Sequence, residues 1–352
     1  MKTFEQFEKK FESIPQATVW YLADLGEARG RQELFTRQSP QKLKILREHA
    51  LIESAVSSNR IEGVTVDQKR VATVIFGTKQ LKDRSEEEVR CYRQALDWIH
   101  RDGSKIPISE KTVLKLHQMS RGEIWDAGKY KEKNVDIIEK YSDGRERVRF
   151  KTVEAARTPG FVGKLTDAWQ DCLKEKSVPP LIALGAFNLD FLCIHPFCDG
   201  NGRVSRLLFL LQCYILGLEA GRYIGLERLI EENKQRYYGT LEQSSRGWHE
   251  GRHDPWPYIN YLLYILKLAY KELEKRIGET SSPRGSKTAL VISAIDRGDE
   301  TFRVSDLLKE CPGVSMDLIR QLLKKLRASG RIACLSRGQN AEWKKTPKWR
   351  IG

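Results

Sequence analysis

The residues best suited to chemistry fall in one short segment, His195 to Arg206, which reads HPFCDGNGRVSR. His195 has an ordinary pKa near neutrality, so its imidazole can accept a proton from an attacking hydroxyl. Asp199 offers the hard oxygen ligand that Mg²⁺ prefers. Arg203 and Arg206 are three residues apart, so on one helix they could both reach the same polyphosphate. A base, a metal ligand and a phosphate clamp therefore fit within one segment.

This segment is a polar, glycine-rich loop between two apolar stretches, 181–194 and 207–216. Gly200 and Gly202 lack side chains and can adopt positive φ angles, so backbone N–H groups near them can approach a ligand closely. The helix predicted to begin near Arg203 would point its positive end at the same place. The loop is therefore a candidate anion-binding site.

The segment matches HPFxxGNGRxxR at every fixed position, and the chain thereby resembles the Fic (filamentation induced by cyclic AMP) family. The resemblance implies an enzyme that binds ATP with Mg²⁺ and transfers AMP to a Ser, Thr or Tyr hydroxyl of a protein, releasing pyrophosphate. It implies His195 as the general base and Asp199 as the Mg²⁺ ligand. It also implies that the nucleotide phosphates are held by Gly200, Asn201, Gly202, Arg203 and Arg206.

Two further segments resemble parts of the same family. The sequence from Tyr237 to Leu241 matches YYxxL, which implies that Tyr238 contacts adenine; packing of both tyrosines in the core stays an alternative. Alternating polar and apolar residues predict strands at 134–138 and 145–153. The resemblance implies that this hairpin, residues 134–151, is a flap that docks the target protein by strand pairing. An ordinary surface hairpin stays the alternative.

The sequence from Ser58 to Gly63 matches [S/T]xxxE[G/N], the inhibitory motif of the family. A carboxylate at Glu62 can pair with Arg206 and draw it from the γ-phosphate, so that ATP binds in a pose unsuited to attack. Ser58, one turn earlier, could fix the helix that carries the glutamate. The resemblance implies the class with an N-terminal inhibitory helix, autoinhibited in cis. Removal of AMP by a water that Glu62 positions stays open as the physiological direction.

Helices must position these motifs. The first 39 residues show no sustained period, and the first clear helix begins after Pro40 and ends near Gly63. Steps of three and four residues predict its buried stripe: Ile45, His49, Ile52 and Val56. Further helices are predicted at 86–101, 109–120, 162–175, 180–194, 203–216, 226–244 and 255–277.

Residues 278–286 lack large apolar side chains and are predicted to be a linker. Beyond them, a helix, a short strand, two helices and two strands resemble a winged helix-turn-helix domain, with Ser305 and Ser315 as N-caps. The predicted fold is mainly α, a Fic helical bundle with a hairpin flap and a C-terminal winged helix. The predicted domains are an inhibitory region at 1–105, a catalytic core at 106–277, and the winged helix at 287–352.

The C-terminal domain carries much of the positive charge. Residues 281–352 hold 15 Lys and Arg against 7 Asp and Glu, which gives +8 of the chain's +14. On the helix predicted at 315–328, the buried stripe would be Leu318, Leu322, Leu323 and Leu326. The residues left to meet DNA phosphates or base edges are Arg320, Lys324 and Lys325. A winged helix used for protein contacts stays open, and so does a DNA-binding regulator that senses nucleotides.

Composition excludes other classes. With 352 residues, 40% hydrophobic and 31% charged, the chain is too long for one small core and too apolar for disorder. No apolar run approaches the roughly 18–20 residues of a bilayer span, and the start has no signal-peptide core. Seven cysteines without a CxxC pair predict a reducing cytoplasm. The target protein, self-modification and a homodimer stay open.

Overall fold

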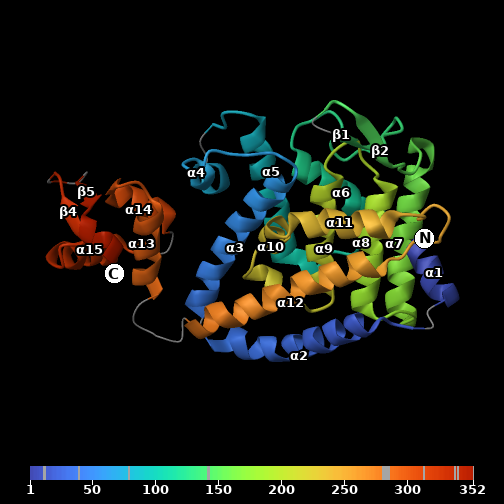
Figure 1. The fold of residues 1–352 in the computed structure, drawn as a ribbon, viewed down its shortest axis with the longest axis horizontal. Coiled ribbons are helices and arrows are strands. Elements are labelled where there is room, and N and C mark those ends of the chain that lie inside the picture. The colour runs from blue at the N-terminus through green and yellow to red at the C-terminus, as the bar shows by residue number, and fades with distance from the viewer. Residues whose placement is uncertain are drawn as a thin grey trace. The chain divides into compact units, whose positions relative to one another are not determined.

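In the part of the chain that the computed structural model describes, the fold is mainly helical, with two small antiparallel sheets, which confirms the predicted fold class (Figure 1). The structure describes residues 1–351 except 11–12, 39, 78–79, 141–142, 280–285, 312–313, 337 and 339–340. The chain divides into two compact units, residues 1–274 and residues 275–352. Most of the predicted linker lies outside the described residues. In the part of the chain that is described, no helix has the length and apolar character needed to cross a bilayer.

Unit 1 holds the elements around the signature loop. Its first six helices are α1 (Lys2–Lys10), α2 (Gln16–Gln38), α3 (Pro40–Ile61), α4 (Val71–Phe76), α5 (Arg84–Asp102) and α6 (Glu110–Arg121). A hairpin of β1 (Ile137–Lys140) and β2 (Glu146–Phe150) follows. The later helices are α7 (Thr158–Glu175), α8 (Pro180–Ile194), α9 (Asn201–Ile215), α10 (Leu226–Glu232), α11 (Lys234–Ser245) and α12 (Trp256–Glu279), which runs past the boundary of the unit.

The centre of unit 1 is the pair α8 and α9, which carries the signature loop between its two helices (Figure 1). Every residue of α8 from Ile182 to Ile194 is buried. A helix that is apolar all round is stable only when other elements surround it. Here α1, α7, α9 and α11 pack on α8, while α3, α5 and α6 pack on α9. Both ends of the loop are therefore anchored in the core.

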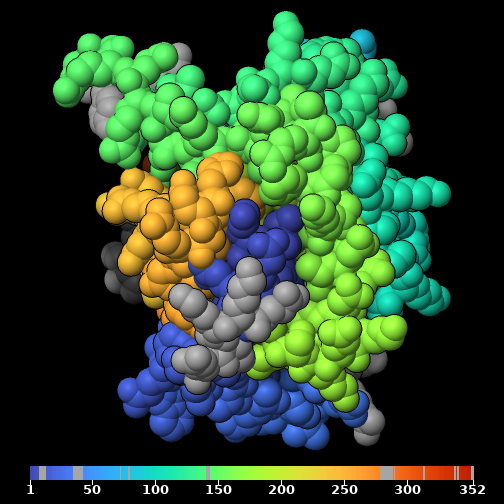
Figure 2. Space-filling model, turned by 90° about the vertical axis from the view of Figure 1, so that its right-hand side faces the viewer, coloured from blue at the N-terminus to red at the C-terminus, as the bar shows by residue number. Residues whose placement is uncertain are grey.

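Within the first 39 residues, whose sequence has no clear helical period, the structure has the helices α1 and α2. Tertiary contacts hold them. Thr18 donates to the side chain of Asn260 at 2.7 Å, and Lys267 pairs with Asp24 at 2.5 Å, which fixes α2 along α12. Figure 2 shows α1, in dark blue, seated between green helices and the yellow-orange segment that leads into α12.

Thr3 fixes α1 to the central helix through a buried carboxylate. Its backbone N–H and hydroxyl both donate to Asp190 on α8, the hydroxyl at 2.6 Å, and the indole of Trp248 donates to the same carboxylate at 2.5 Å. Burial raises the pKa of Asp190 to about 6, although these hydrogen bonds oppose the shift. The N-terminal helix is therefore part of the core around α8.

The helix predicted after Pro40 is α3, and Gly63 follows its end with a φ of 83°. The predicted stripe is wrong, because Ile45, His49, Ile52 and Val56 are only half-buried. The buried face is formed mostly by small residues: Leu43, Ala50, Leu51, Ser54, Ala55 and Ser58. Small side chains allow α5 and α10 to pack closely on α3 from two sides. The buried face of α3 is therefore the one with small residues and not the more apolar stripe that the sequence predicted.

The single helix predicted at 226–244 is two helices, α10 and α11, divided at Asn233. Asn233 has a φ of −112° and a ψ of 26°, outside the helical range, and its side-chain amide donates to the Leu229 carbonyl at 2.9 Å. Asparagine bonds to its own neighbourhood in this way and thereby competes with helix continuation. The break lets α11 run in a new direction, with Tyr237 and Tyr238 on it.

Unit 2 consists of α13 (Ser286–Arg297), β3 (Thr301–Arg303), α14 (Val304–Glu310), α15 (Met316–Ala328), β4 (Ile332–Cys334) and β5 (Glu342–Lys345). The antiparallel sheet has the order β3-β5-β4. Ser315 caps α15 as predicted, because its hydroxyl accepts from the Leu318 N–H at 3.3 Å. Ser305 is not a cap: α14 begins one residue earlier, and Asp306 accepts from the Arg303 N–H at 3.0 Å.

The buried side of α15 is formed by Ile319, Leu322, Leu323 and Leu326. Three of the four predicted leucines are therefore buried, while Leu318 packs at the edge of this core. The opposite side of α15 exposes Arg320, Lys324 and Lys325, as the sequence predicted.

Candidate active site

The signature loop begins where α8 ends in a left-handed residue. His195 has a φ of 52°, and its N–H closes the helix on the Phe191 carbonyl at 3.0 Å. A positive φ is uncommon for a residue other than glycine, and here it ends α8. Gly200 (φ 82°) makes the second turn, directly before α9. A Cβ at Gly200 would lie 3.1 Å from the Arg121 side chain, so glycine suits both the conformation and the space.

Asn201 holds the loop in shape. Its side-chain carbonyl accepts from the Phe197 N–H at 2.9 Å, and its amide donates to the Phe197 carbonyl at 2.8 Å. The side chain that the sequence assigned to a phosphate is thus buried and bonded within the loop. Its backbone N–H, at the first position of α9, is the group left to meet an anion.

His117 on α6 packs against the signature loop and bonds to it, a role that the local sequence did not predict. Its ring stacks on Phe197 with centroids 3.7 Å apart. Nδ1 accepts from the Gly128 N–H at 3.0 Å, so the proton is on Nε2, which donates to the Asp199 carbonyl at 3.1 Å. Burial lowers the pKa of His117 to about 4, and the ring is therefore neutral.

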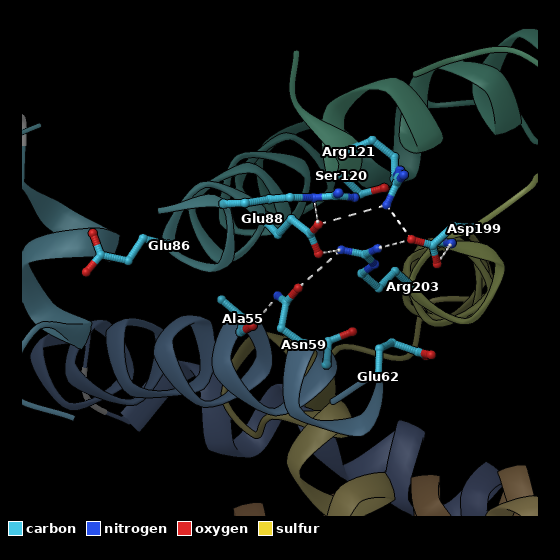
Figure 3. A network of polar contacts seen from close by, with 12 residues as sticks. Ala55, Asn59, Glu62, Glu86, Glu88, Ser120, Arg121, Asp199 and Arg203 are labelled. Atoms are coloured by element: carbon cyan, nitrogen blue, oxygen red, sulfur yellow. Dashed lines mark hydrogen bonds and ion pairs between the residues drawn. The ribbon is translucent and has the colours of Figure 1, made fainter. Parts of the chain in front are cut away.

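A buried ionic network lies behind the loop (Figure 3). The Arg203 guanidinium pairs with Glu88 of α5 at 2.5 Å and contacts Asp199 at 3.5 Å. Arg121 of α6 pairs with the same oxygen of Asp199 at 2.5 Å. The side chain of Arg203 is only 1% exposed, so this arginine, assigned to a phosphate by the sequence, is enclosed by protein partners. The local sequence gave no sign of Glu88 or Arg121 because both are distant along the chain.

Asp199 is the member of this network that reaches solvent, with 56% of its side chain exposed. Burial alone would raise the pKa of Asp199, but Arg203 and Arg121 lower it below its ordinary value, so the carboxylate is ionised at neutral pH. The described residues contain no cluster of three His, Cys, Asp or Glu side chains placed to hold a metal ion. One ionised, accessible carboxylate fits a Mg²⁺ ion that arrives with substrate phosphates, because the phosphates supply further ligands.

The structure brings together the three residues of the predicted inhibitory contact. Arg206 donates through Nη2 to Glu62 Oε1 at 2.8 Å and to the Ser58 carbonyl at 3.0 Å, and through Nε to the Ser58 hydroxyl at 2.8 Å. Gly202 admits the glutamate, since a Cβ there would lie 2.2 Å from Glu62 Oε1. Burial would lower the pKa of Arg206, but Glu62 raises it, so this guanidinium stays charged.

The end of α3 that carries Glu62 is also held by α11. Lys234, the first residue of α11, donates to the Ile61 carbonyl at 2.7 Å, and its ammonium lies 5.8 Å from the centroid of the Tyr238 ring. Arg60 adds an exposed ion pair with Glu231 at 3.3 Å. The position of Glu62 therefore depends on α11 as well as on Arg206.

A cavity of about 210 Å³ lies over these residues. Its lining includes Glu62, Arg149, Leu192, His195, Gly202, Tyr237 and Tyr238. Burial, followed by the charge of Lys131, lowers the pKa of His195 to about 4. The imidazole is therefore neutral at physiological pH, and it is a weaker base than the near-neutral pKa expected from the sequence would make it.

The two tyrosines of α11 differ in their surroundings. Tyr237 is buried against Tyr258 and Tyr261, with ring centroids 6.0 and 5.7 Å away. Tyr238 is only half-buried. Core packing therefore accounts for much of Tyr237, while Tyr238 has an aromatic surface left for a ligand.

Lys131 connects the loop to the hairpin. Its buried ammonium donates to the Thr152 hydroxyl at 2.7 Å and to the Ile194 carbonyl at 3.3 Å, and its N–H donates to the Pro196 carbonyl at 2.9 Å. Burial lowers the pKa of Lys131 to about 8. Lys131, through its side chain and its backbone N–H together, thus fixes the residues on both sides of His195 to the base of the hairpin.

Comparison with known proteins agrees with this geometry. Residues 107–213 match the model of the Fic/DOC family. The chain is similar to the structure of a Fic family protein from Desulfovibrio desulfuricans G20, with 25% identity over 95% of this chain and 97% of that chain and a TM-score of 0.60. It is also similar to a Fic domain containing signaling protein from Bacteroides thetaiotaomicron (20% identity, 73% and 99% covered, TM-score 0.59). A third similar structure is Fic-1 from C. elegans (19% identity, 76% and 75% covered, TM-score 0.57).

Residues 107–213, which run from just before α6 into α9 and include the signature loop, are thus similar to the Fic/DOC family. This confirms the resemblance carried by the segment from His195 to Arg206. Proteins with this domain generally transfer nucleotidyl groups to other proteins.

Proposed function

We propose that the chain is a protein adenylyltransferase, which transfers AMP from ATP to a Ser, Thr or Tyr hydroxyl. The observation that carries this proposal is the neutral His195 in one cavity with Tyr238, at the N-terminus of α9. The hydroxyl oxygen would form a bond to the α-phosphorus, and the bond from that phosphorus to the bridging oxygen of pyrophosphate would break. His195 would take the hydroxyl proton.

The elements around the cavity suit a nucleotide. The first N–H groups of α9, beside Gly200 and Gly202, form the positive end of a helix and would hold the α- and β-phosphates. Arg206 would meet the γ-phosphate once it is free of Glu62, and Tyr238 would contact the base. Asp199 would hold Mg²⁺, which supplies positive charge that stabilises the phosphates in the transition state.

We propose further that Glu62 restrains this activity in cis. Glu62 accepts a hydrogen bond from the Arg206 guanidinium, which the γ-phosphate would need, and its carboxylate lines the cavity. Repulsion between this carboxylate and the phosphates would place ATP in an unreactive pose. If Glu62 instead orients a water molecule, the same arrangement would remove AMP from a modified target. The target segment would dock along the hairpin, residues 134–151, and the chain's own hydroxyls are candidate acceptors.

The test is mass spectrometry of the intact and digested Glu62→Gly chain after incubation with Mg²⁺ and ATP. We expect one or more AMP groups on Ser, Thr or Tyr, and none when His195→Ala is added. Parallel incubations with GTP, CTP and UTP identify the donor. Binding of Mg·ATP without any AMP transfer to the chain or to proteins of a cell extract would contradict the proposal.

A second function, DNA binding by unit 2, is favoured by one observation. Arg320, Lys324 and Lys325 project from the exposed side of α15, opposite its buried stripe. The order α13-β3-α14-α15-β4-β5 resembles that of a winged helix-turn-helix domain, in which the second of two adjacent helices enters the major groove. Either role of the chain, transferase or nucleotide-sensing regulator, could use this surface.

Fluorescence anisotropy with a labelled duplex tests DNA binding across a series of salt concentrations. We expect affinity to fall steeply with salt, and the Lys324→Ala, Lys325→Ala double variant to reduce the log–log slope by about 2. Lys309→Ala, an exposed lysine on α14, is the control with little expected change. A parent chain without salt-dependent binding would leave unit 2 as a surface for protein contacts.

A further inference from the structure

The pairing of β1 with β2 has an irregularity at Arg149. In the pairing of β1 with β2, Ile138 lies opposite Val148 and Ile137 lies opposite Phe150, so Arg149 has no partner residue and forms a bulge. A bulge breaks the alternation of a strand and redirects one side chain. Here the redirected side chain lines the cavity that also contains His195 and Glu62.

Arg149 reaches from the hairpin to α11. Its Nη2 donates to the backbone carbonyl of Tyr238 at 2.8 Å, and the same nitrogen lies 3.4 Å from Glu242. The guanidinium carbon is 5.8 Å from the centroid of the Tyr238 ring. The Arg149 side chain therefore contacts the backbone and the ring of Tyr238 and the carboxylate of Glu242, all on α11.

Two other arginines pair with Glu242 but do not line the cavity. Arg147 and Arg246 each approach the Glu242 carboxylate to 3.2 Å, and their side chains are 54% and 75% exposed. The side chain of Arg149 is 21% exposed, and of the three it alone lines the cavity. Exposed ion pairs contribute little, because water and salt screen them. The chain thus provides a matched control on the same strand, Arg147.

We propose that Arg149 is a nucleotide-positioning residue, which fixes the hairpin and Tyr238 as two walls of one cavity that takes a purine nucleotide. The proposal rests on the assignment of this cavity to ATP. The aromatic ring of Tyr238 offers stacking area, and the hairpin supplies Ile137 and Phe150 from the other side. These walls keep their spacing only while the hairpin stays on α11. Arg147 also joins the hairpin to α11 through Glu242, but that pair is exposed, whereas the bond from Arg149 to the Tyr238 carbonyl lies at the cavity.

This arrangement predicts that nucleotide affinity and hairpin position are coupled. Without Arg149 the hairpin has more freedom, and binding must order it at a cost to affinity. The free energy of ordering the hairpin would be spent when the nucleotide binds, so loss of Arg149 should weaken nucleotide binding more than it slows the chemical step. The hydroxyl-bearing segment of a target would then pair with a hairpin that is already ordered. His195 and the loop keep their own supports, such as Lys131.

The experiment measures the dissociation constant of Mg·ATP by calorimetry for the full chain carrying Glu62→Gly, with Arg149→Met, Arg149→Lys or Arg147→Met added. We expect Arg149→Met to weaken binding about tenfold and Arg147→Met less than twofold. Arg149→Lys keeps a cation and one donor but not the fork, and should recover part of the affinity. Equal melting temperatures of the Arg149→Met and Arg147→Met chains would show that the difference is not one of folding.

AMP transfer by the same chains gives a second readout. The KM for ATP should rise in Arg149→Met with kcat within about threefold of the parent, which a general loss of structure would not produce. Equal effects of Arg149→Met and Arg147→Met on ATP binding would overturn the inference and leave the transferase proposal intact. Unequal effects on binding in a chain that never transfers AMP would support the inference and remove the transferase proposal. A Glu62→Gly chain that does not bind Mg·ATP would overturn both.

Discussion

Two ion pairs lie on α9 less than one turn apart, and they differ in how they are enclosed. Arg203 pairs with Glu88, and their side chains are 1% and 6% exposed. Arg206 pairs with Glu62, whose side chain is 29% exposed. Glu88 lies within α5 and also holds Arg84 at 2.8 Å, whereas Glu62 lies just past the end of α3. The first pair is part of the core, whereas the second has a carboxylate that reaches solvent.

The difference matters because the cost of losing a pair depends on what remains. Removal of one partner from a buried pair leaves a charge without water or counter-charge, which is strongly destabilising. Arg206 also has two bonds to Ser58, which would remain without Glu62, and under the proposed function an incoming phosphate would bring a new counter-charge. The geometry therefore suits Arg203 to a fixed role and Arg206 to an exchange of partners.

The largest expected effect is on the stability of the enclosed pair. Glu88→Gln should reduce the free energy of unfolding by roughly 3 kcal/mol, because Arg203 would lose its nearest counter-charge within the core and keep only the longer contact with Asp199 at 3.5 Å. Denaturant unfolding measures this. The control is Asp97→Asn on the same helix, where the pair with Arg93 is partly exposed and should contribute less than about 1 kcal/mol. A similar loss in both variants would show that the two kinds of pair do not differ.

A smaller effect is expected where Glu62 meets α9. In Gly202→Ala the new Cβ would clash with the Glu62 carboxylate, so the free energy of unfolding should fall by roughly 1–3 kcal/mol. Most of this loss should disappear when Glu62→Gly is added, because the clashing group is gone. If the loss persists in the double variant, the close approach of Glu62 to Gly202 is not its cause.

The smallest effect is expected at the outer support of the same contact. Lys234→Met removes the bond to the Ile61 carbonyl, which should reduce the free energy of unfolding by about 1 kcal/mol. It should also raise AMP transfer, though less than Glu62→Gly does, because the end of α3 becomes freer to move. Arg60→Ala, which removes only an exposed pair, should change neither quantity appreciably.

The functional residues of the signature loop could be predicted from the sequence, but the residues that pack against the loop could not. The spacing of His195, Asp199 and Arg206 is a local property, so a motif can reveal it. His117, Arg121 and Glu88 become neighbours of the loop only after α5 and α6 pack on α9, and no local pattern marks them. Asn201 shows the converse, since its place in the motif suggested a ligand while its side chain bonds to the loop itself.

The same contrast holds for the fold. The apolar α8 and the capped α15 were predictable, because burial and capping leave direct traces in sequence. The stripe of α3 was not, because packing from two sides favours small residues over the most apolar ones. The helices of the first 39 residues depend on contacts such as Thr3 with Asp190, which connect distant parts of the chain.

Under the proposed function Glu62, by holding Arg206, restrains a transfer that depends on His195. The most direct test is the initial rate of AMP incorporation from labelled ATP into the full chain, at saturating Mg·ATP, for the parent, Glu62→Gly, and Glu62→Gly with His195→Ala. We predict a rise of at least about tenfold in the single variant and a fall of roughly 10²–10⁴-fold from that level in the double variant. Equal rates for the parent and Glu62→Gly, or undiminished transfer without His195, would contradict the claim.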